Sequence, residues 1–512
     1  MIISSPKIRD ILLCLASAAL ITLSFPKTDC WILAWGALVP FFFAIEGKKP
    51  KEAFKTGFLF GALLFLGTLY WFFNITRWFS FIAGFGVGLL ILYLALYPAF
   101  FGLFYTYFSN KKIFGKLILI PCLWVALEFI RARALSGFGW VSFGYSQYRN
   151  LYFAQIADMT GVYGVSFAIV LTNVALKSAI SEYMAGKSVL KAAKIILPAL
   201  VILALVFSYG YFKVKRDNNA IKNRKTQRVG IVQPNILQDD KWHQEKWEGI
   251  IGKLDSLSSS FVRGDVEMIV WPESIVPAVL EDDIALKGRL HDFVSDKQIP
   301  LLYGINTREG DKYYNSAVLL SADSQQIASY SKIHLVPFGE YLPFRKELPF
   351  LSDLVPIGDF TFGKEYVLFP FPGEKELFFS VLICFEDTVE TLARKAVQKG
   401  AGFLVNITND AWFGDSKEPF LHLQAAVFRA IENNRFMARS ANTGVSCFID
   451  NMGRVYNAVS SKGKRLVYSD GTSAGGVIFI REMTFYTKFG DIFTYLCFGC
   501  ILISVILKLR KF

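Results

Sequence analysis

The sequence predicts a multi-span α-helical membrane domain joined to an α/β domain. Of its 512 residues, 53% are hydrophobic and only 19% are charged, against roughly 45–50% and about 25% in soluble globular proteins. Eight apolar windows account for much of this excess. Between residues 227 and 480 the pattern changes, and short β-rich runs alternate with helix-like stretches, which is typical of α/β layer folds.

Most of the apolar windows are long enough for membrane helices, which need about 20 residues to cross the hydrocarbon core. They lie near residues 10–25, 31–45, 57–73, 80–106, 113–130, 161–182, 195–212 and 491–507. The first window resembles a signal peptide, but the further windows close behind it favour an uncleaved span. We therefore predict a membrane domain of seven transmembrane helices in residues 1–215, and a C-terminal transmembrane helix with a cytoplasmic tail in 485–512.

The positive charges are unevenly distributed over the loops. Segments assigned to the inner side hold 16 Lys and Arg, and the alternating outer segments hold 5. The positive-inside rule then places both termini in the cytoplasm and residues 216–480 on the outer side of the membrane. Because much of the net charge of +13 is explained by this asymmetry, we expect no nucleic-acid partner.

A polar linker at residues 216–226 precedes a catalytic domain predicted for residues 227–480. The strand-like runs are 228–233, 266–271, 299–305, 314–320, 378–383 and 402–407. The helix-like stretches lie near 241–260, 282–297, 388–399 and 419–433. This alternation is the basis for the α/β prediction.

Cysteine and histidine usage argues against a disulfide framework and a metal site. The seven cysteines are odd in number, and the single CxxC pair, Cys497 and Cys500, lies inside the last apolar window. The four histidines are scattered, and no HExxH motif occurs. We therefore expect neither a metal nor another cofactor.

Three polar residues in the α/β part are candidates for catalysis. Cys384 ends the apolar run SVLIC, and a helix starting there would favour its thiolate. Glu273 follows Val-Trp-Pro at a strand end and could act as a general base. Lys332, within YSKIHLVPFGEY, could hold an oxyanion. Taken singly, each also has an ordinary explanation as a buried thiol, a helix-start acid or a surface lysine.

Together these residues resemble the Glu-Lys-Cys triad of the nitrilase, or carbon–nitrogen hydrolase, superfamily. The motifs WPES, YSKIHLVPFGEY and LICFED occur in the order of that triad, 59 and 52 residues apart. The blocks NITNDAWF and RSANTG also resemble the superfamily, so the likeness covers about residues 227–460. It implies an αββα sandwich fold.

The apolar windows around this domain narrow the resemblance to the apolipoprotein N-acyltransferases of the bacterial inner membrane. HLVPFGEYLPF, NDAWFGDS, GFGW and FGYSQ are similar to motifs of that family. The resemblance implies a phospholipid acyl donor, a thioester on Cys384 and transfer to the α-amino group of a lipoprotein's diacylglyceryl-cysteine. It also implies that the catalytic domain is periplasmic. We expect a monomer.

The resemblance also assigns supporting residues. Glu340 would support Lys332, Glu386 would lie beside the nucleophile, and a backbone N–H near Phe385 would help to hold the oxyanion. Phe385 stands where many relatives have Tyr. Trp242 resembles a tryptophan on a substrate loop, with a packed helix-start aromatic as the alternative. Trp140 belongs to the GFGW motif and would lie on an outer loop.

Residues 338–372 are rich in phenylalanine, which predicts a lid that contacts lipid beside the site. The alternative is a loop packed on the core. The phenylalanines concerned are Phe338, Phe344, Phe350, Phe360, Phe362, Phe369 and Phe371.

Three other functions are open at this point. His291 and Asp296 match the HxxxxD motif of glycerolipid acyltransferases, although two such residues five apart arise easily by chance. A membrane-tethered amidase would use the same triad with water as the acceptor. A transporter or receptor with a degenerate nitrilase domain is disfavoured by the intact triad of Glu273, Lys332 and Cys384.

Overall fold

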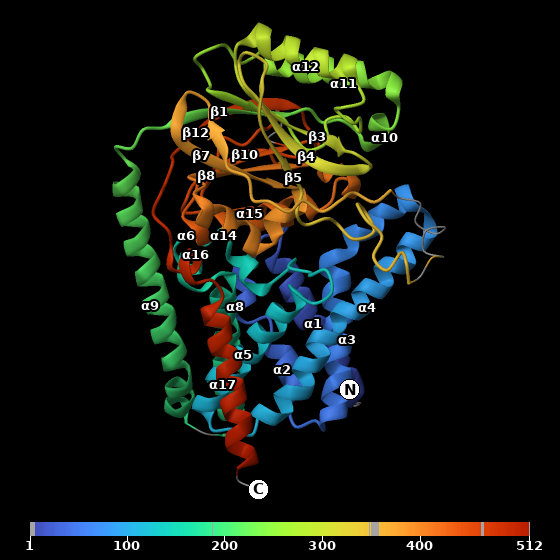
Figure 1. Ribbon diagram of the computed structural model, residues 1–512. Helices are drawn as coiled ribbons and strands as arrows, with labels where there is room; N and C mark the ends of the chain where they lie inside the picture. Colours follow the sequence, from blue (N-terminus) through green and yellow to red (C-terminus); the bar gives the residue numbers. More distant parts are fainter. Residues whose placement is uncertain (1–5, 187, 348, 350–357, 462–464, 511–512) are drawn as a thin grey trace. The chain divides into compact units, whose positions relative to one another are not determined.

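The computed structural model describes residues 6–186, 188–347, 349, 358–461 and 465–510 (Figure 1). The chain divides into two compact units. Unit 1 comprises Met1–Arg216 and Phe489–Phe512, and unit 2 comprises Asp217–Lys488.

Unit 1 is a bundle of helices. Its elements are α1 (Pro6–Ser24), η1 (Trp31–Trp35), α2 (Val39–Ile45), α3 (Pro50–Leu69), η2 (Tyr70–Ile75), α4 (Thr76–Phe108), α5 (Ile113–Arg131), η3 (Phe143–Gln147), α6 (Leu151–Ala154), α7 (Ala157–Thr160), α8 (Val162–Met184), α9 (Val189–Ile221) and α17 (Ile492–Leu509). Glycines let α3 and α4 approach closely, as small residues do in membrane bundles. A Cβ on Gly57 would lie 2.3 Å from the carbonyl oxygen of Pro98.

Within the described residues, six helices are long and apolar enough to cross a membrane. They are Pro50–Trp78, Ile82–Phe108, Ile113–Arg131, Val162–Met184, Val189–Ile221 and Ile492–Leu509. The first predicted window is helical as α1, but this helix begins with Lys7, Arg9 and Asp10. The second window forms only the short helices η1 and α2. The arrangement of eight spans therefore stays a prediction.

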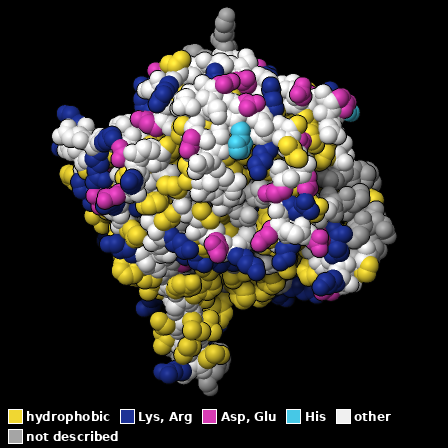
Figure 2. All heavy atoms as spheres, turned by 45° about the horizontal axis from the view of Figure 1, so that its top comes forward, with side chains coloured by type: hydrophobic (Ala, Val, Ile, Leu, Met, Phe, Trp, Pro, Cys, Tyr) yellow, Lys and Arg dark blue, Asp and Glu magenta, His cyan; other side chains and the backbone are white. Residues whose placement is uncertain are grey.

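The outer faces of the unit 1 helices carry hydrophobic side chains. Leu200 and Leu205 on α9 are 54% and 65% exposed, and Leu502 on α17 is 59% exposed. Figure 2 shows hydrophobic side chains gathered over these helices, while charged side chains of both signs are spread over unit 2. An apolar exterior of this extent is expected where lipid, and not water, is the solvent.

Unit 2 is built on two six-stranded sheets. The first has the order β12-β1-β2-β3-β4-β5 and the second the order β11-β10-β9-β8-β7-β6. The strands are β1 (Gln227–Gln233), β2 (Met268–Val270), β3 (Leu301–Glu309), β4 (Lys312–Leu320), β5 (Gln326–Ser331), β6 (Phe369–Phe371), β7 (Glu374–Ile383), β8 (Phe403–Thr408), β9 (Met437–Ala441), β10 (Cys447–Ile449), β11 (Val455–Tyr456) and β12 (Gly471–Val477). The helices are α10 (Gln238–Lys241), η4 (Gln244–Lys246), α11 (Trp247–Ser258), α12 (Ile284–Lys297), η5 (Cys384–Thr388), α14 (Glu390–Lys399), η6 (Asp410–Phe413), α15 (Glu418–Asn433) and α16 (Phe485–Phe489).

The two sheets pack face to face, with helices on both outer sides. Successive side chains of β2 point to opposite faces of the sheet and show this arrangement. Met268 and Val270 belong to the core between the sheets. The intervening Ile269 belongs to a second core formed with α11 and α12. Helices α14 and α15 contact strands of the other sheet (Figure 1). The expected αββα sandwich is thus confirmed.

Candidate active site

The three predicted catalytic residues lie just beyond the ends of strands. Lys332 directly follows β5 and Cys384 directly follows β7, while Glu273 comes three residues after β2. Strands β2 and β3 are parallel, and two antiparallel steps through β4 give β5 the same direction. The carboxyl ends of β2 and β5 therefore meet at one edge of their sheet, where α/β folds place reactive groups.

Glu273 and Glu340 hold the Lys332 ammonium between them. Nζ of Lys332 lies 3.3 Å from Oε1 of Glu273 and 2.9 Å from Oε1 of Glu340. Asn315 on β4 donates from Nδ2 to these two oxygens, at 2.8 and 2.7 Å. The backbone N–H of Asn409 donates to Oε2 of Glu273 at 3.0 Å. This network fixes both carboxylates and brings Glu340 into contact with Lys332, and a supporting role of Glu340 in catalysis stays a prediction.

Lys332 is almost completely buried, with 1% of its surface exposed. Burial by itself lowers the pKa of this ammonium, but the carboxylates of Glu340 and Glu273 raise the pKa above its ordinary value. Lys332 therefore stays charged at neutral pH. A fixed, buried cation is well suited to stabilise negative charge that develops on a substrate oxygen.

Cys384 occupies a backbone conformation that non-glycine residues seldom adopt, with φ of +52°. Its carbonyl oxygen accepts hydrogen bonds from Nδ2 of Asn406, at 3.2 Å, and from Nε2 of His422, at 3.1 Å. These two contacts stabilise the turn that carries the thiol. Strained residues of this kind cluster at functional sites because the surrounding structure holds them in place.

The Cys384 thiol is not activated by its environment alone. Burial and the carboxylate of Glu273 raise its pKa well above the ordinary value, and the Lys332 ammonium only partly opposes them. The expected lowering of the pKa by a helix N-terminus is therefore wrong. The helix that begins here, η5, has only five residues, so its dipole is small. A neutral thiol needs a general base, and Glu273 is that candidate.

Glu386 ties the end of β5 to the end of β7. Its Oε1 accepts from the N–H groups of Ile333 and His334, at 2.7 and 3.0 Å. Its Oε2 accepts from the N–H of Ile383 at 2.9 Å, and the Tyr330 hydroxyl donates to the same carboxylate at 2.8 Å. Burial raises the pKa of Glu386 to about 7 despite these donors. Glu386 thus acts on the neighbours of Lys332 and Cys384, and we interpret it as a positioning residue.

The aromatic candidates are placed differently. Phe385 is half-buried, and its ring centre lies 5.6 Å from that of His334. Trp242 is 58% exposed and meets Trp412 edge to face at 6.1 Å. Trp140 belongs to unit 1, where it is buried with its ring centre 5.4 Å from that of Trp71. Substrate contacts of Trp242 and Trp140 stay predictions.

The segment before Trp242 also contributes a buried lysine that the sequence did not single out. Nζ of Lys241 donates to the carbonyl oxygen of Ser274 at 2.7 Å, next to Glu273. Burial lowers the pKa of Lys241 to about 8, and the charge of Glu273 opposes this shift. Lys241 therefore secures the turn that carries the candidate base.

The predicted lid is only partly supported. Phe338, Phe344 and Phe362 are 50%, 59% and 45% exposed, as a lipid-contacting segment requires. Phe369 and Phe371 are buried in β6, so their inclusion in the lid was wrong. They pack against β7 in the core between the sheets. Phe360 is half-buried, and Phe350 lies outside the described residues.

A buried ionic network lies directly behind the nucleophile. Nδ1 of His422 lies 3.0 Å from Asp410 and Nε2 lies 2.8 Å from Asp387. The Arg439 guanidinium contacts the same two carboxylates, at 2.8 Å from Asp387 and 3.4 Å from Asp410. Although burial lowers the pKa of His422, the carboxylates raise it to about 10. Two cations therefore balance two carboxylates.

The side chains of Asp410, Glu418 and His422 are close enough to hold a metal ion, with ligand atoms within 4.8 Å of one another. A metal ligand must be a neutral imidazole, however, and the carboxylates favour the protonated form of His422. Burial and Asp410 also raise the pKa of Glu418 well above its ordinary value, which favours the neutral acid. The donor set therefore suits an ionic network better than a metal site.

The His422 network predicts a pH dependence of stability. A folded-state pKa of about 10 against 6.5 for a free imidazole means that the stabilisation is complete below pH 6.5 and is lost as the pH rises through 10. The unfolding midpoint of detergent-solubilised wild type should fall over this range, and His422→Gln should flatten the fall. His243→Gln, at an exposed histidine, is the matched control. An unchanged slope in His422→Gln would refute the protonated network.

Comparison with known proteins gives matches to both units. Residues 17–175 match the model of the apolipoprotein N-acyltransferase N-terminal domain, and residues 228–474 match that of carbon-nitrogen hydrolase. Among solved structures, the amidase from Nesterenkonia sp. AN1 matches with a TM-score of 0.39 at 16% identity, covering 53% of this chain and 99% of that one.

Two curated relatives match nearly the whole length. The apolipoprotein N-acyltransferase of Chlorobaculum tepidum is 29% identical over 97% of this chain and 96% of its own. That of Geobacter metallireducens is 36% identical and covers 98% of this chain and 96% of its own. Because the family models match both units and a relative with 36% identity covers 98% of this chain, the chain belongs to the apolipoprotein N-acyltransferase family.

Proposed function

We propose that this protein transfers an acyl chain from a phospholipid to the α-amino group of the diacylglyceryl-cysteine of a lipoprotein, through a thioester on Cys384. Family membership supports the reaction type. The observation that carries the assignment to residues is the cluster of a carboxylate, a buried ammonium and a thiol, Glu273, Lys332 and Cys384, which follow the ends of β2, β5 and β7. No metal or other cofactor takes part in this scheme.

In the first half-reaction, Glu273 takes the proton of the Cys384 thiol and the sulfur attacks the ester carbonyl of the phospholipid. The oxyanion that forms is stabilised by the Lys332 ammonium and by the backbone N–H of Phe385. The C–O bond then breaks, and the departing lysophospholipid oxygen takes the proton from Glu273. An acyl thioester is left on Cys384.

In the second half-reaction, the α-amino group of the acceptor attacks the thioester carbonyl. Glu273 accepts a proton from the attacking amine, and Lys332 again holds the oxyanion. Breaking the C–S bond forms the amide and releases the thiolate, which recovers its proton from Glu273. Glu340 and Asn315 keep Lys332 and Glu273 in position in both halves.

The proposed setting is the bacterial inner membrane. Unit 2 lies on the periplasmic side, both termini are cytoplasmic, and the protein acts as a monomer. The charge asymmetry of the loops supports this orientation. The exposed phenylalanines at 338, 344 and 362 support contact between the segment near the site and lipid.

The runner-up is a membrane-tethered amidase with the same triad and water as the acceptor. Family membership disfavours it, because the curated relatives that match this chain over nearly its whole length are named as acyltransferases. The motif of His291 and Asp296 lies on α12, which packs on the outer face of the first sheet. This motif is separate from the Cys384 network and supports no alternative chemistry.

The test compares acceptors. Purified protein in phospholipid should convert a peptide with a diacylglyceryl-cysteine N-terminus to its N-acyl form. The same peptide acetylated on the α-amino group should give no product, because the attacking nitrogen is blocked. Mass spectrometry of the peptide reads both results. Release of free fatty acid at equal rates with and without the open amine would overturn the transferase proposal in favour of hydrolysis.

A further inference from the structure

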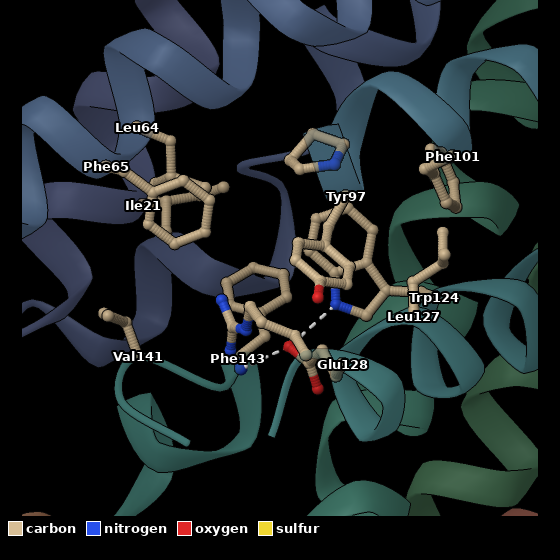
Figure 3. A pocket seen from close by; sticks show the side chains of 12 residues that line it. Ile21, Leu64, Phe65, Tyr97, Phe101, Trp124, Leu127, Glu128, Val141 and Phe143 are labelled. Carbon is tan, nitrogen blue, oxygen red and sulfur yellow. Dashed lines mark hydrogen bonds between the residues drawn. The ribbon is translucent and has the colours of Figure 1, made fainter. Parts of the chain in front are cut away.

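The buried charged side chains of the two units differ in what they contact. In unit 1, Glu128 lines a mainly apolar cavity and accepts from the indole N–H of Trp124 at 2.9 Å (Figure 3). In unit 2, His422 is only 1% exposed and contacts the backbone of Cys384, the candidate nucleophile. A charge in contact with the backbone of the nucleophile can influence the bonds that the reaction makes. The His422 network therefore has a direct route to the chemistry.

Both ring nitrogens of His422 face hydrogen-bond acceptors. Nδ1 lies 3.0 Å from Oδ1 of Asp410, and Nε2 lies 3.1 Å from the carbonyl oxygen of Cys384. A neutral imidazole has one donor and one acceptor, so it could satisfy only one of these contacts. The imidazolium satisfies both, in agreement with the raised pKa of His422. His422 therefore directs a positively charged donor at the carbonyl oxygen of Cys384.

The charges around the ring leave this donor directed at the carbonyl. Nε2 also lies 2.8 Å from Oδ1 of Asp387, but that oxygen has no hydrogen-bond partner among the described residues. Nδ1 lies 3.6 Å from Oε1 of Glu418, whose raised pKa favours the neutral acid. The Arg439 guanidinium contacts the carboxylates of Asp387 and Asp410 as well. The imidazolium thus shares its two counter-ions with a second cation.

A second donor reaches the same carbonyl oxygen. Nδ2 of Asn406 donates to it at 3.2 Å, and Oδ1 of Asn406 accepts from Nη1 of Arg439 at 2.6 Å. The turn held in this way is uncommon, because Cys384 has a φ of +52°. A neutral amide is a sufficient donor to hold a turn. The charge of His422 therefore points to an electrostatic role in addition to a structural one.

The carbonyl of Cys384 and the N–H of Phe385 are the two ends of one peptide group. Because the C–N bond has partial double-bond character, a donor on the oxygen draws electron density from the nitrogen and makes the N–H a stronger donor. This N–H is the one that helps to hold the oxyanion in the proposed reaction. In a trans peptide the oxygen and the hydrogen point in opposite directions, so a charge behind the turn can act on a donor in front of it.

We propose that His422, as an imidazolium, is a positioning residue that polarises the peptide group between Cys384 and Phe385 and so strengthens the Phe385 N–H as an oxyanion donor. This inference rests on the proposed thioester chemistry, in which that N–H acts. Both half-reactions pass through an oxyanion, so loss of the charge should slow both by a similar factor. We expect roughly three- to tenfold, less than the roughly 10²–10³-fold lost when an oxyanion donor is removed.

The test is the infrared spectrum of the acyl thioester on Cys384. Full-length, detergent-solubilised protein is acylated with a small soluble ester, with and without an isotope label on its carbonyl carbon, and the difference spectrum isolates the thioester carbonyl band. A stronger oxyanion donor lowers the frequency of this band, so His422→Gln should move it to higher frequency. The glutamine amide is a neutral donor, and Asn406 still holds the turn. A band at the wild-type frequency in a folded His422→Gln would overturn the proposal.

A charge-balanced variant separates this role from a structural one. His422→Gln leaves the carboxylates of Asp387 and Asp410 with one cation, Arg439, and should therefore unfold more easily. Adding Asp410→Asn restores the balance, so stability should recover while the carbonyl band and both rates stay as in His422→Gln. His243→Gln, at an exposed histidine, should change neither. Recovery of the band and the rates in the double variant would show that His422 only stabilises the fold, and would overturn the proposal.

The two half-reactions distinguish an effect on the peptide group from an effect on the thiol. If the charge of His422 acted on the thiol proton, only acylation of Cys384 would slow, and discharge of the thioester by an amine would keep its wild-type rate. That result would also overturn the proposal. Failure of the wild type to form an acyl thioester would instead contradict the proposed function, so the two failures have different readouts.

Discussion

Replacing Cys384 by alanine is expected to abolish acyl transfer, by roughly 10⁴-fold or more, because the nucleophile is removed. The measurement is the rate of N-acylation of a diacylglyceryl-cysteine peptide in phospholipid. The variant should keep its fold, because the turn is held through the carbonyl of residue 384 by Asn406 and His422. Near-UV circular dichroism monitors the fold.

Cys447→Ala is the matched control. Cys447 is a buried cysteine on β10 in the same unit, and burial raises the pKa of its thiol to about 12. It has no place in the proposed chemistry, so transfer should continue in this variant. Residual transfer by Cys384→Ala within tenfold of the wild type would remove Cys384 from the mechanism.

Glu273→Gln is expected to slow acylation of Cys384 by roughly 10²–10⁴-fold, the usual contribution of a general base. Burial and Glu273 raise the pKa of the Cys384 thiol well above its ordinary value, so little thiolate exists at neutral pH without a base. The rate in the variant should therefore rise about tenfold per pH unit as hydroxide takes over the role of the base. A small soluble ester serves as the donor.

Glu267→Gln is the control for this variant. Glu267 directly precedes β2 and is exposed, so its loss should leave the rate and its pH profile unchanged. Wild-type acylation rates in Glu273→Gln would show that another group takes the thiol proton. A slow rate that is flat with pH would instead indicate a misplaced thiol.

The α/β fold was predictable where strands are bulky and apolar. Runs such as SVLI before Cys384 and VEMIVW before Glu273 correspond to β7 and β2. The strand β12 was missed because its sequence, GTSAGGV, has almost no large apolar side chain. It pairs along its whole length with β1, so tertiary context and not local propensity makes it a strand.

The membrane windows were predictable as helices but not as spans. Hydropathy alone does not separate a helix that crosses the bilayer from one buried in a bundle. The window at 31–45 breaks into η1 and α2, and Asn173 binds this region by donating to the carbonyl oxygen of Ala34. The two residues are 139 positions apart in the sequence, so this contact leaves no local signal in the sequence around residues 31–45.

The same reason limits what could be predicted of the site. Glu273, Lys332 and Cys384 could be identified as catalytic candidates because each lies in a short, recognisable sequence motif. Asn315 and His422 have no such motif, and they reach the site only through the fold, from 42 residues beyond Glu273 and 38 residues beyond Cys384. A polar residue inside an apolar strand, as Asn315 is in YYNSAVLL, was the one available signal.

The central claim is that an acyl thioester forms on Cys384, and the intact mass of the protein tests it most directly. After mixing with phospholipid alone, the wild type should gain the mass of one acyl chain, and digestion should place it on the peptide that contains Cys384. Adding the diacylglyceryl-cysteine peptide should return the protein to its original mass as the acyl chain passes to the amine. Transfer to the peptide without an acylated protein at any time, or acylation that persists in Cys384→Ala, would contradict the account.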